Sequence, residues 1–209
     1  MEKQTIAVLF GGQSSEHEVS CMSAANILEQ IDRDKYEILM IGITKEGKWL
    51  LAEDLSEVRD GSWKNSRKQA VILPDAVKKC ALIMENGRTE EVRLDAVFPV
   101  LHGLYGEDGT IQGLLELAQI PYVGCGVLSS AVSMDKFYTK IIVDTLGIRQ
   151  ARYVGVRRRD LDKMPEIICR VEEELGYPVF VKPSCAGSSV GVSRADNAQE
   201  LEEGIRLAA

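Results

Sequence analysis

Histidine is scarce in this sequence, and the cysteines are not arranged as in a disulfide-bonded or zinc-binding protein. There are two histidines, His17 and His102, and five cysteines that are scattered along the chain without a CxxC pair. A histidine-based metal cluster is therefore not expected. An odd, scattered set of cysteines also argues against a disulfide framework. We expect a protein of the reducing cytoplasm.

The sequence also lacks long apolar runs and dense basic segments. No run approaches the roughly 20 apolar residues that a membrane helix needs, and the first residues do not have the pattern of a signal peptide. Lys and Arg total 25 against 32 Asp and Glu, and the one basic run is Arg157 to Arg159. Such a short run is typical of a solvated face. We therefore expect neither a membrane nor a nucleic acid as a partner.

What the sequence has is enough apolar residues for a core, arranged as alternating strands and helices. Of the 209 residues, 45% are hydrophobic, which suits one or two domains. Thr5 to Phe10 is an apolar, β-rich run that ends in glycines, and Tyr36 to Ile43 is a second run of this kind. Between them, Ser15 and Glu18 have the S-x-x-E spacing of a capping box at a helix start. This βαβ order predicts an α/β fold with a parallel sheet.

The remaining pattern predicts two domains. The less regular segment 44–91 is interpreted as an insertion at the sheet edge, and Asp135 is placed to cap a helix that begins at Lys136. The character of the chain changes within Ser133 to Arg152, so we expect domains at 1–134 and 135–209. Further strands are predicted at 49–52, 70–73, 80–84, 95–101, 152–156, 178–182 and 190–193, and further helices near 110–120, 126–134 and 165–175 and from 198 onward.

A glycine-rich segment with two glutamates follows the first predicted strand. It reads Gly11-Gly12-Gln13-Ser14-Ser15-Glu16-His17-Glu18-Val19-Ser20. Glycines allow the backbone to approach a ligand, and ligands of open α/β sheets bind beyond the carboxyl ends of the strands. Glu18 already has a role in the capping box, so Glu16 can face this region and hold an ammonium group. The alternative is that Glu16 only stabilises the positive end of the helix.

A second polar segment follows the strand predicted at 95–101. It begins His102-Gly103 and continues Leu104-Tyr105-Gly106-Glu107-Asp108-Gly109. A histidine beside glycines at a strand end can donate a hydrogen bond to a substrate carboxylate or orient an attacking amine. The alternative is a histidine with a purely structural role.

A third segment, Val179 to Val192, has the pattern of a phosphate-binding hairpin. A strand ends at Lys182, a loop of small residues reverses the chain, and a second strand leaves. Backbone N–H groups of such a loop can contact phosphate oxygens while a lysine neutralises their charge. It is not a Walker A loop, because the GK[ST] ending and its helix are missing. An ordinary hairpin would not need a lysine on the buried side next to Pro183.

Four motifs together resemble the D-alanine–D-alanine ligase family. They are the G-G-x-S-x-E-H-x-V-S opening, H-G-x-x-G-E-D-G, Ser133-Met134-Asp135-Lys136, and Val181-Lys182-Pro183 with Gly187-Ser188-Ser189-Val190-Gly191. They occur in the family's order and rough spacing over nearly the whole chain. The resemblance implies an α/β fold with a Rossmann-like N-terminal domain, followed by the first, small subdomain of an ATP-grasp domain that is incomplete here.

The resemblance also implies roles for individual residues. Glu16 resembles the carboxylate that binds the ammonium of the first D-alanine, with Val19 beside its methyl group. His102 resembles the residue near the substrate carboxylates and the attacking amine. Lys136 and Lys182 resemble the lysines on the ATP phosphates. The stretch Gly187, Ser188, Ser189 and Val190 resembles the loop that covers the phosphates, and its serine Ser188 joins the family's glutamate-serine-tyrosine network.

The implied reaction joins two D-alanines through an acyl phosphate, for peptidoglycan synthesis. ATP and Mg²⁺ or Mn²⁺ are the implied cofactors, D-alanine the implied substrate and a homodimer the implied assembly. In relatives the metal ligands lie beyond the position of Ala209, so no metal ligand is assigned here, and we expect the 209-residue chain alone not to ligate D-alanine. The alternatives are a D-alanine–D-serine or D-alanine–D-lactate ligase, and a non-catalytic amino-acid-binding module.

Overall fold

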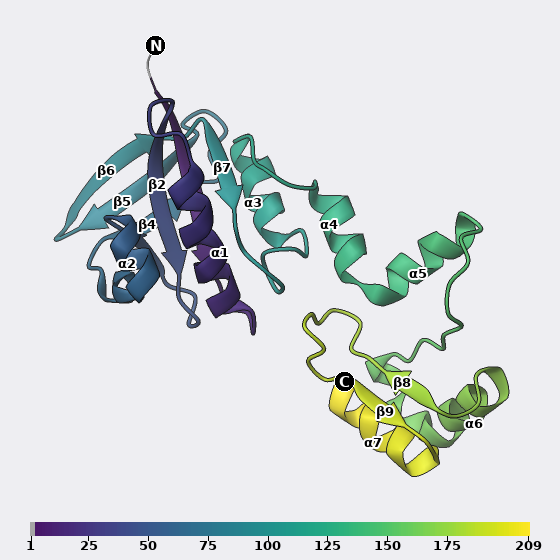
Figure 1. Ribbon diagram of the computed structural model, residues 1–209. Helices are drawn as coiled ribbons and strands as arrows, with labels where there is room; N and C mark the ends of the chain where they lie inside the picture. Colours follow the sequence, from purple (N-terminus) through teal and green to yellow (C-terminus); the bar gives the residue numbers. More distant parts are fainter. Residues whose placement is uncertain (1–2) are drawn as a thin grey trace. The chain divides into compact units, whose positions relative to one another are not determined.

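The computed structural model describes residues 3–209, which form two compact units (Figure 1). The first unit ends at Ala131 and the second runs from Val132 to Ala209. The division falls inside helix α4 (Val127–Met134). No helix of the described residues is long and apolar enough to span a membrane.

The first unit contains a seven-stranded sheet in the order β6-β5-β4-β3-β2-β1-β7. Strand β1 (Gln4–Gly11) lies between β2 (Tyr36–Ile43) and β7 (Ala96–Pro99) and is parallel to both. The predicted parallel sheet and α/β class are therefore confirmed, with the carboxyl ends of these three strands at one edge. All three strands are largely apolar, as expected for parallel strands covered on both faces.

Four antiparallel strands extend this sheet from β2. They are β3 (Trp49–Ala52), β4 (Gln69–Ile72), β5 (Cys80–Glu85) and β6 (Arg88–Arg93). The first three were predicted as short strands at the sheet edge, whereas β6 was not predicted. Its sequence, RTEEVR, is polar and mostly exposed, so it has no apolar pattern to reveal it.

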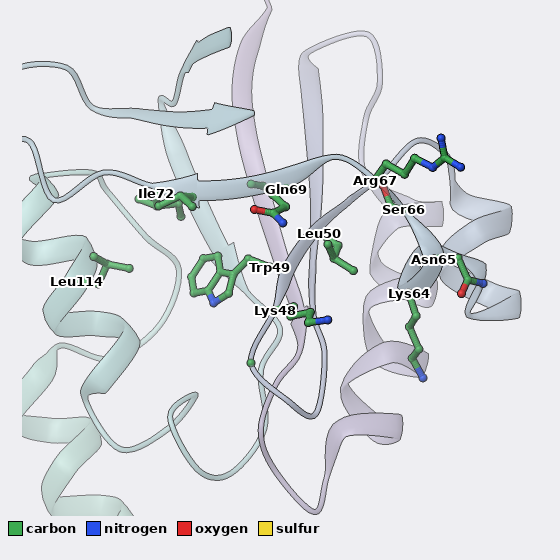
Figure 2. A pocket seen from close by; sticks show the side chains of 13 residues that line it. Lys48, Trp49, Leu50, Lys64, Asn65, Ser66, Arg67, Gln69, Ile72 and Leu114 are labelled. Atoms are coloured by element: carbon green, nitrogen blue, oxygen red, sulfur yellow. The ribbon is translucent and has the colours of Figure 1, made fainter. Parts of the chain in front are cut away.

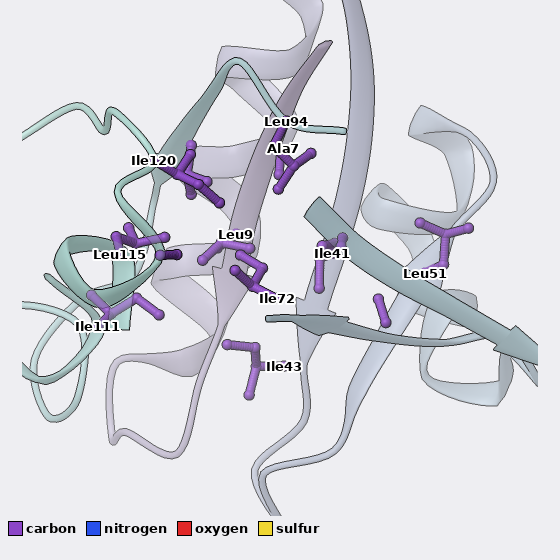
Figure 3. Packing of buried hydrophobic residues seen from close by; sticks show 14 of the residues in the cluster. Ala7, Leu9, Ile41, Ile43, Leu51, Ile72, Leu94, Ile111, Leu115 and Ile120 are labelled. Carbon is purple, nitrogen blue, oxygen red and sulfur yellow. The ribbon is translucent and has the colours of Figure 1, made fainter. Parts of the chain in front are cut away.

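Helices cover both faces of the sheet. Successive strand residues point to opposite faces, so Ala7 and Leu9 pack on one face and Val8 and Phe10 on the other. The first face is covered by α3 (Thr110–Ala118) through Ile111 and Leu115 (Figure 3). The other face is covered by α1 (His17–Gln30), α2 (Leu55–Asp60) and the 3-10 helix η1 (Ser62–Asn65).

The second unit has a separate hydrophobic cluster, to which two of its helices and a hairpin contribute most. Its helices are α5 (Lys136–Thr145), α6 (Met164–Glu174) and α7 (Ala198–Ala208), with the 3-10 helix η2 (Arg158–Lys163) before α6. Strands β8 (Val179–Val181) and β9 (Ser193–Ala195) pair antiparallel. The cluster includes Ile167 and Val171 of α6 and Leu201 and Ile205 of α7.

Two predicted strands of this unit need correction. Residues 152–156 are not a strand: Val154 and Val156 pack against the cluster of the second unit, but no strand within residues 3–209 pairs with this segment. The strand predicted at 190–193 instead occupies Ser193–Ala195. The chain turns before it, because Val190 N donates to Gly187 O and Gly191 has a φ of 70°.

Candidate functional site

Gly11 and Gly12 shape the end of β1, and the structure leaves no space for a side chain at Gly11. A Cβ there would lie 2.3 Å from the carbonyl oxygen of Ile43 and 2.9 Å from the His17 ring, and Gly11 has a φ of 84°. Gly12 N donates to the same Ile43 oxygen at 2.8 Å. The glycines thus let the chain turn closely over the end of β2 before α1 begins.

Ser20 joins the ends of β1 and β7. Its buried hydroxyl accepts a hydrogen bond from Gly11 N at 2.8 Å and donates one to Val100 O at 2.5 Å. This contact links two segments that are 80 residues apart in the sequence. It holds the first two polar motifs at one edge of the sheet.

The predicted capping box of Ser15 and Glu18 is wrong. Helix α1 begins at His17, its N-cap residue is Glu16, and no side chain caps it. Glu18 is exposed and pairs instead with Lys45 at 3.2 Å and Lys64 at 3.7 Å. The hydrogen bond with Lys45 lowers the pKa of Glu18. Glu18 therefore interacts with cations away from its own helix end.

Glu16 lies against the second polar motif. A Cβ built on Gly103 would be only 2.6 Å from Glu16 Oε2 and 2.7 Å from Ser14 Oγ. The Glu16 side chain is half-buried, and its backbone N–H donates to Ser14 Oγ at 3.1 Å. The structure thus brings the Glu16 carboxylate beside Gly103, the residue after His102.

His102 is half-buried and is oriented by two neighbours. Its Nε2 lies 3.2 Å from Ser23 Oγ of α1, and its Nδ1 lies 3.9 Å from Glu107 Oε1. Glu107 also accepts a hydrogen bond from Gly103 N at 2.8 Å. Val19, on the first turn of α1, is 54% exposed. Ser23 and Glu107 were not singled out from the sequence, although Glu107 is part of the H-G-x-x-G-E-D-G motif.

In the second unit, the loop between β8 and β9 carries Lys182 and the small residues Gly187 to Val190. Lys182 is exposed, so its predicted position on the buried side is wrong: it directly follows β8, whose central residue Phe180 is 63% exposed. Val190 is 50% exposed, and Ser188 and Ser189 have positive φ angles of 46° and 59°. The loop therefore presents polar backbone and small side chains to solvent.

Lys136 lies beside the base of this loop. Its ammonium donates to the carbonyl oxygens of Ala186 and, at 3.5 Å, Ser184, and its backbone N donates to Ser184 O at 3.0 Å. Asp135 caps α5, as predicted, by accepting from Phe137 N and Tyr138 N. The structure thus brings Lys136 together with the loop that contains Gly187 to Val190.

A separate hollow of about 770 Å³ lies on the antiparallel side of the first unit (Figure 2). It is lined by β3, β4 and the end of η1, with Leu114 of α3 opposite Trp49. Lys64 and Arg67 supply positive charge at its side. None of the residues predicted to bind substrate or ATP lines it.

The described residues do not fit the expected Mg²⁺ or Mn²⁺. Within 3–209, one group of three potential ligands has its atoms within 4.8 Å of one another: His17, Glu18 and Cys21. These metals prefer carboxylate, carbonyl and water oxygens, and the group offers a single carboxylate, which already pairs with two lysines.

The fold and these residues define the class of protein. It is an α/β protein with polar loops at the carboxyl ends of parallel strands, the usual position of ligand sites in such sheets, followed by a unit with a lysine-bearing, glycine-rich hairpin. Comparison with known proteins identifies the family within this class. The family described as "D-ala D-ala ligase N-terminus" matches residues 5–125, and "D-ala D-ala ligase C-terminus" matches residues 142–209. The chain belongs to the D-alanine–D-alanine ligase family.

Individual relatives support this family assignment. The D-alanine–D-alanine ligase of Caldicellulosiruptor bescii is 48% identical over 96% of this chain and 56% of its own length, and that of Acetivibrio thermocellus is 48% identical over 100% and 59%. The solved VanG D-Ala:D-Ser ligase of Enterococcus faecalis is 38% identical with a TM-score of 0.89, covering 99% of this chain and 60% of that one. The D-alanine-D-alanine ligase of Coxiella burnetii is 35% identical, with a TM-score of 0.85 and the same two coverages. The chain thus spans less than two thirds of the length of these relatives.

Proposed function

We propose that this chain supplies the first amino-acid site and part of the ATP site of an enzyme that joins two D-alanines. The observation that supports it best is the position of the Glu16 carboxylate beside Gly103, at the carboxyl edge of β1 and β7. It places an acidic side chain and a histidine motif from distant parts of the sequence at one sheet edge. Family membership supports the identity of the ligand.

Within this proposal, the first unit binds the amino acid. The Glu16 carboxylate attracts the ammonium of the first D-alanine, and exposed Val19 contacts its methyl group. His102, oriented by Ser23 and Glu107, donates a hydrogen bond to a substrate carboxylate or orients the attacking amine. A half-buried carboxylate suits this role, because a charge interaction strengthens as water is excluded.

The second unit binds the phosphates of ATP. Lys182 is exposed, the Lys136 ammonium lies at the loop base, and the backbone of Gly187 to Ser189 provides N–H donors. Cations and backbone donors are what a transferring phosphoryl group requires, since positioning and charge stabilisation supply most of its acceleration. We place Ser188 in the polar network that the family forms around the site.

The proposed reaction has two steps. A carboxylate oxygen of the first D-alanine attacks the γ-phosphorus of ATP, the bond to ADP breaks, and an acyl phosphate forms. The amine of the second D-alanine then attacks the activated carbonyl carbon, loses a proton, and phosphate leaves with the C–O bonding electrons. We further propose that the whole protein is a cytoplasmic homodimer that serves peptidoglycan synthesis, and that ligands for Mg²⁺ or Mn²⁺ lie outside residues 3–209.

A second candidate has its own support. The VanG structure, 38% identical over 99% of this chain, is described as a D-Ala:D-Ser ligase. D-Serine as the second substrate would use the same first-substrate residues. We favour D-alanine, because relatives 48% identical to this chain are named D-alanine–D-alanine ligase.

The test is an assay of the whole gene product that contains this chain. Phosphate release from ATP is measured with D-alanine alone and with D-alanine plus D-serine or D-lactate. We expect D-alanine alone to suffice. Release only with D-serine or D-lactate would select the second candidate or a D-lactate ligase, and no release with any of the three would support a binding module.

Two glutamates of the same segment give a matched pair of variants. Glu16→Gln removes the charge that faces the amino acid, so we expect the KM for D-alanine to rise at least tenfold, the effect of losing about 1.4 kcal/mol of binding. Glu18→Gln removes a charge that pairs with surface lysines, and we expect its KM to stay within twofold. Equal effects of the two variants would contradict the role of Glu16.

A further inference from the structure

One carboxylate in the second unit makes contacts on both sides of a junction between α5 and the β8–β9 loop. Oδ1 of Asp135 accepts from Phe137 N at 2.9 Å and Tyr138 N at 3.2 Å, and also from the hydroxyl of Ser184. Oδ2 accepts from the thiol of Cys185 at 3.4 Å. Asp135 therefore caps a helix and binds a loop 49 and 50 residues further along the chain.

These hydrogen bonds favour the charged form of Asp135. Burial by itself would raise the pKa of the Asp135 carboxyl, but the bonds from the Ser184 hydroxyl, the Tyr138 amide and the Cys185 thiol outweigh it, and the pKa lies below its usual value. Hydrogen bonds to an ionised acceptor are roughly twice as strong as neutral ones. An ionised carboxylate thus holds the loop against α5, in addition to capping the helix.

The neighbouring residue adds a second set of bonds to the same short stretch. Lys136 donates from its backbone N to Ser184 O at 3.0 Å and from its ammonium to the carbonyl oxygens of Ser184 and Ala186. Phe137 N also lies 3.4 Å from the Ser184 hydroxyl oxygen. Residues 184–186 are therefore fixed to the first turn of α5 by side chains and by backbone.

The fixed stretch is short and lies just before the exposed part of the loop. Ser184 is two residues after Lys182, and Ala186 directly precedes the segment Gly187 to Val190, of which the last three residues are exposed. Fixing the base shortens the part of the loop that must become ordered when a ligand binds, which lowers the entropy cost of ordering it.

We propose that Asp135 and Ser184 are positioning residues that fasten the base of the phosphate-binding loop to α5, so that Lys136, Lys182 and Gly187 to Val190 form one preorganised unit. This inference rests on the proposed ATP-binding role of the loop. It assigns to Asp135 a task beyond helix capping and to Ser184 a task that nothing in its sequence position indicates. The structural part, a loop base fixed by one carboxylate, can be tested without ATP.

The structural test is amide hydrogen exchange on the 209-residue chain. Asp135→Asn keeps an oxygen that can cap α5, since Asn is as good an N-cap as Asp, but it removes the charge and the second acceptor oxygen. We expect exchange of amides in 184–190 to rise at least fivefold in Asp135→Asn and in Ser184→Ala. The matched control is Asp54→Asn: Asp54 caps α2 through Ser56 N and Glu57 N and accepts from the Ser56 hydroxyl, but contacts no distant loop. Unchanged exchange in both test variants would overturn the proposal.

The functional test separates positioning from a general loss of structure. In the whole gene product, Asp135→Asn and Ser184→Ala should raise the KM for ATP about tenfold, which corresponds to about 1.4 kcal/mol, while the KM for D-alanine stays within twofold. Ser184→Thr keeps the hydroxyl and should restore most of the ATP affinity. Equal changes in both KM values, or no recovery with Thr, would contradict a positioning role.

The two tests also distinguish failure of this inference from failure of the proposed function. If the wild-type product releases no phosphate, the proposed function is wrong, and hydrogen exchange alone decides whether Asp135 fixes the loop base. If phosphate is released but the exchange of residues 184–190 does not respond to Asp135→Asn, the positioning role is wrong and the proposed function stands.

Discussion

At the scale of single residues, the contact between Glu16 and Gly103 depends on the absence of a side chain. Gly103 has a φ of 70°, and a Cβ there would be within 2.7 Å of both the Glu16 carboxylate and the Ser14 hydroxyl. Either side chain would have to move to make room. The glycine thus sets the position of the carboxylate that we assign to the substrate ammonium.

We expect Gly103→Ala to weaken D-alanine binding because it displaces Glu16. The KM for D-alanine should rise about tenfold or more, and the KM for ATP should change little. The control is Gly87→Ala, which has a similar φ of 75° but nothing within 4 Å of the new Cβ. Both variants incur about 1–2 kcal/mol of left-handed backbone strain. A rise in KM in the control as well would assign the effect to strain rather than to Glu16.

The thiol of Cys185 gives a chemical readout of Asp135. Burial raises the pKa of Cys185, and its hydrogen bond to the Asp135 carboxylate and the negative charge there raise it further. The thiolate is the reactive form. In Asp135→Asn the pKa falls, so at pH 7.5 a larger share of Cys185 is thiolate, and we expect iodoacetamide to label it about two- to fivefold faster.

Peptide mass spectrometry of the labelled chain would measure this rate against an internal reference. Cys169 is exposed, and its pKa is raised chiefly by a hydrogen bond to Glu173, so its labelling should be the same in both proteins. Slower labelling of Cys185 in Asp135→Asn would be opposite to the expected sign.

At the scale of elements, Ser20 connects a helix to two strands. Its hydroxyl on α1 bonds Gly11 N at the end of β1 and Val100 O just after β7. Gly11, Ser20 and Val100 are all buried. Loss of the Ser20 hydroxyl therefore removes a partner from the Gly11 N–H donor and from the Val100 carbonyl acceptor.

We expect Ser20→Ala to destabilise the first unit by about 1–3 kcal/mol, the cost of leaving buried polar groups without a partner. Urea unfolding followed by circular dichroism would measure it. Ser15→Ala is the control, since Ser15 is exposed and lies outside α1, and we expect a change within about 0.5 kcal/mol. A large effect of Ser15→Ala would instead restore a capping role for that serine.

The elements also show which features the sequence could predict. The strands β1, β2 and β7 are predictable because each is a nearly continuous apolar run, and α5 is predictable because Asp135 stands where an N-cap belongs. The strand β6 was missed although a signal exists: Asn86 and Gly87, both with positive φ, form the Asn-Gly pair typical of a tight hairpin. The apolar residues Val154 and Val156 alternate, a pattern that favours a strand at 152–156, yet an alternating pattern cannot show that a partner strand is missing.

For the candidate site, sequence motifs identified residues but not their neighbours. Glu16 and His102 follow strands that the pattern predicts, so their common edge could be anticipated. The contacts of Asp135 with Ser184 and Cys185 could not, because they join segments about 50 residues apart through hydrogen bonds that leave no periodic pattern. The capping argument for Glu18 failed because lysines at positions 45 and 64, distant in sequence, offer the carboxylate stronger partners than its own helix end.

At the scale of the whole molecule, each unit has its own apolar interior. Two clusters flank the sheet of the first unit, and a third, separate cluster lies between α6, α7 and the hairpin. A cavity made in one interior should therefore act first on the amides of that unit.

We expect Leu201→Ala to destabilise the second unit by about 2–5 kcal/mol, as for a large core side chain replaced by Ala. Leu201 is 2% exposed. Hydrogen exchange should rise in α6 and α7, with the β1 and β2 amides unchanged. Leu207→Ala on the same helix is the control, because Leu207 is 69% exposed. Loss of protection in β1 on the Leu201 substitution would contradict separate interiors.

The polar strand β6 has a consequence for solubility. It forms one border of the seven-stranded sheet, and Arg88, Glu90, Glu91 and Arg93 are all exposed on it. A border strand offers unpaired backbone groups to any passing chain, and charged side chains there discourage intermolecular β-pairing and fibril growth. The charged residues that leave β6 without an apolar pattern thus protect the sheet against aggregation.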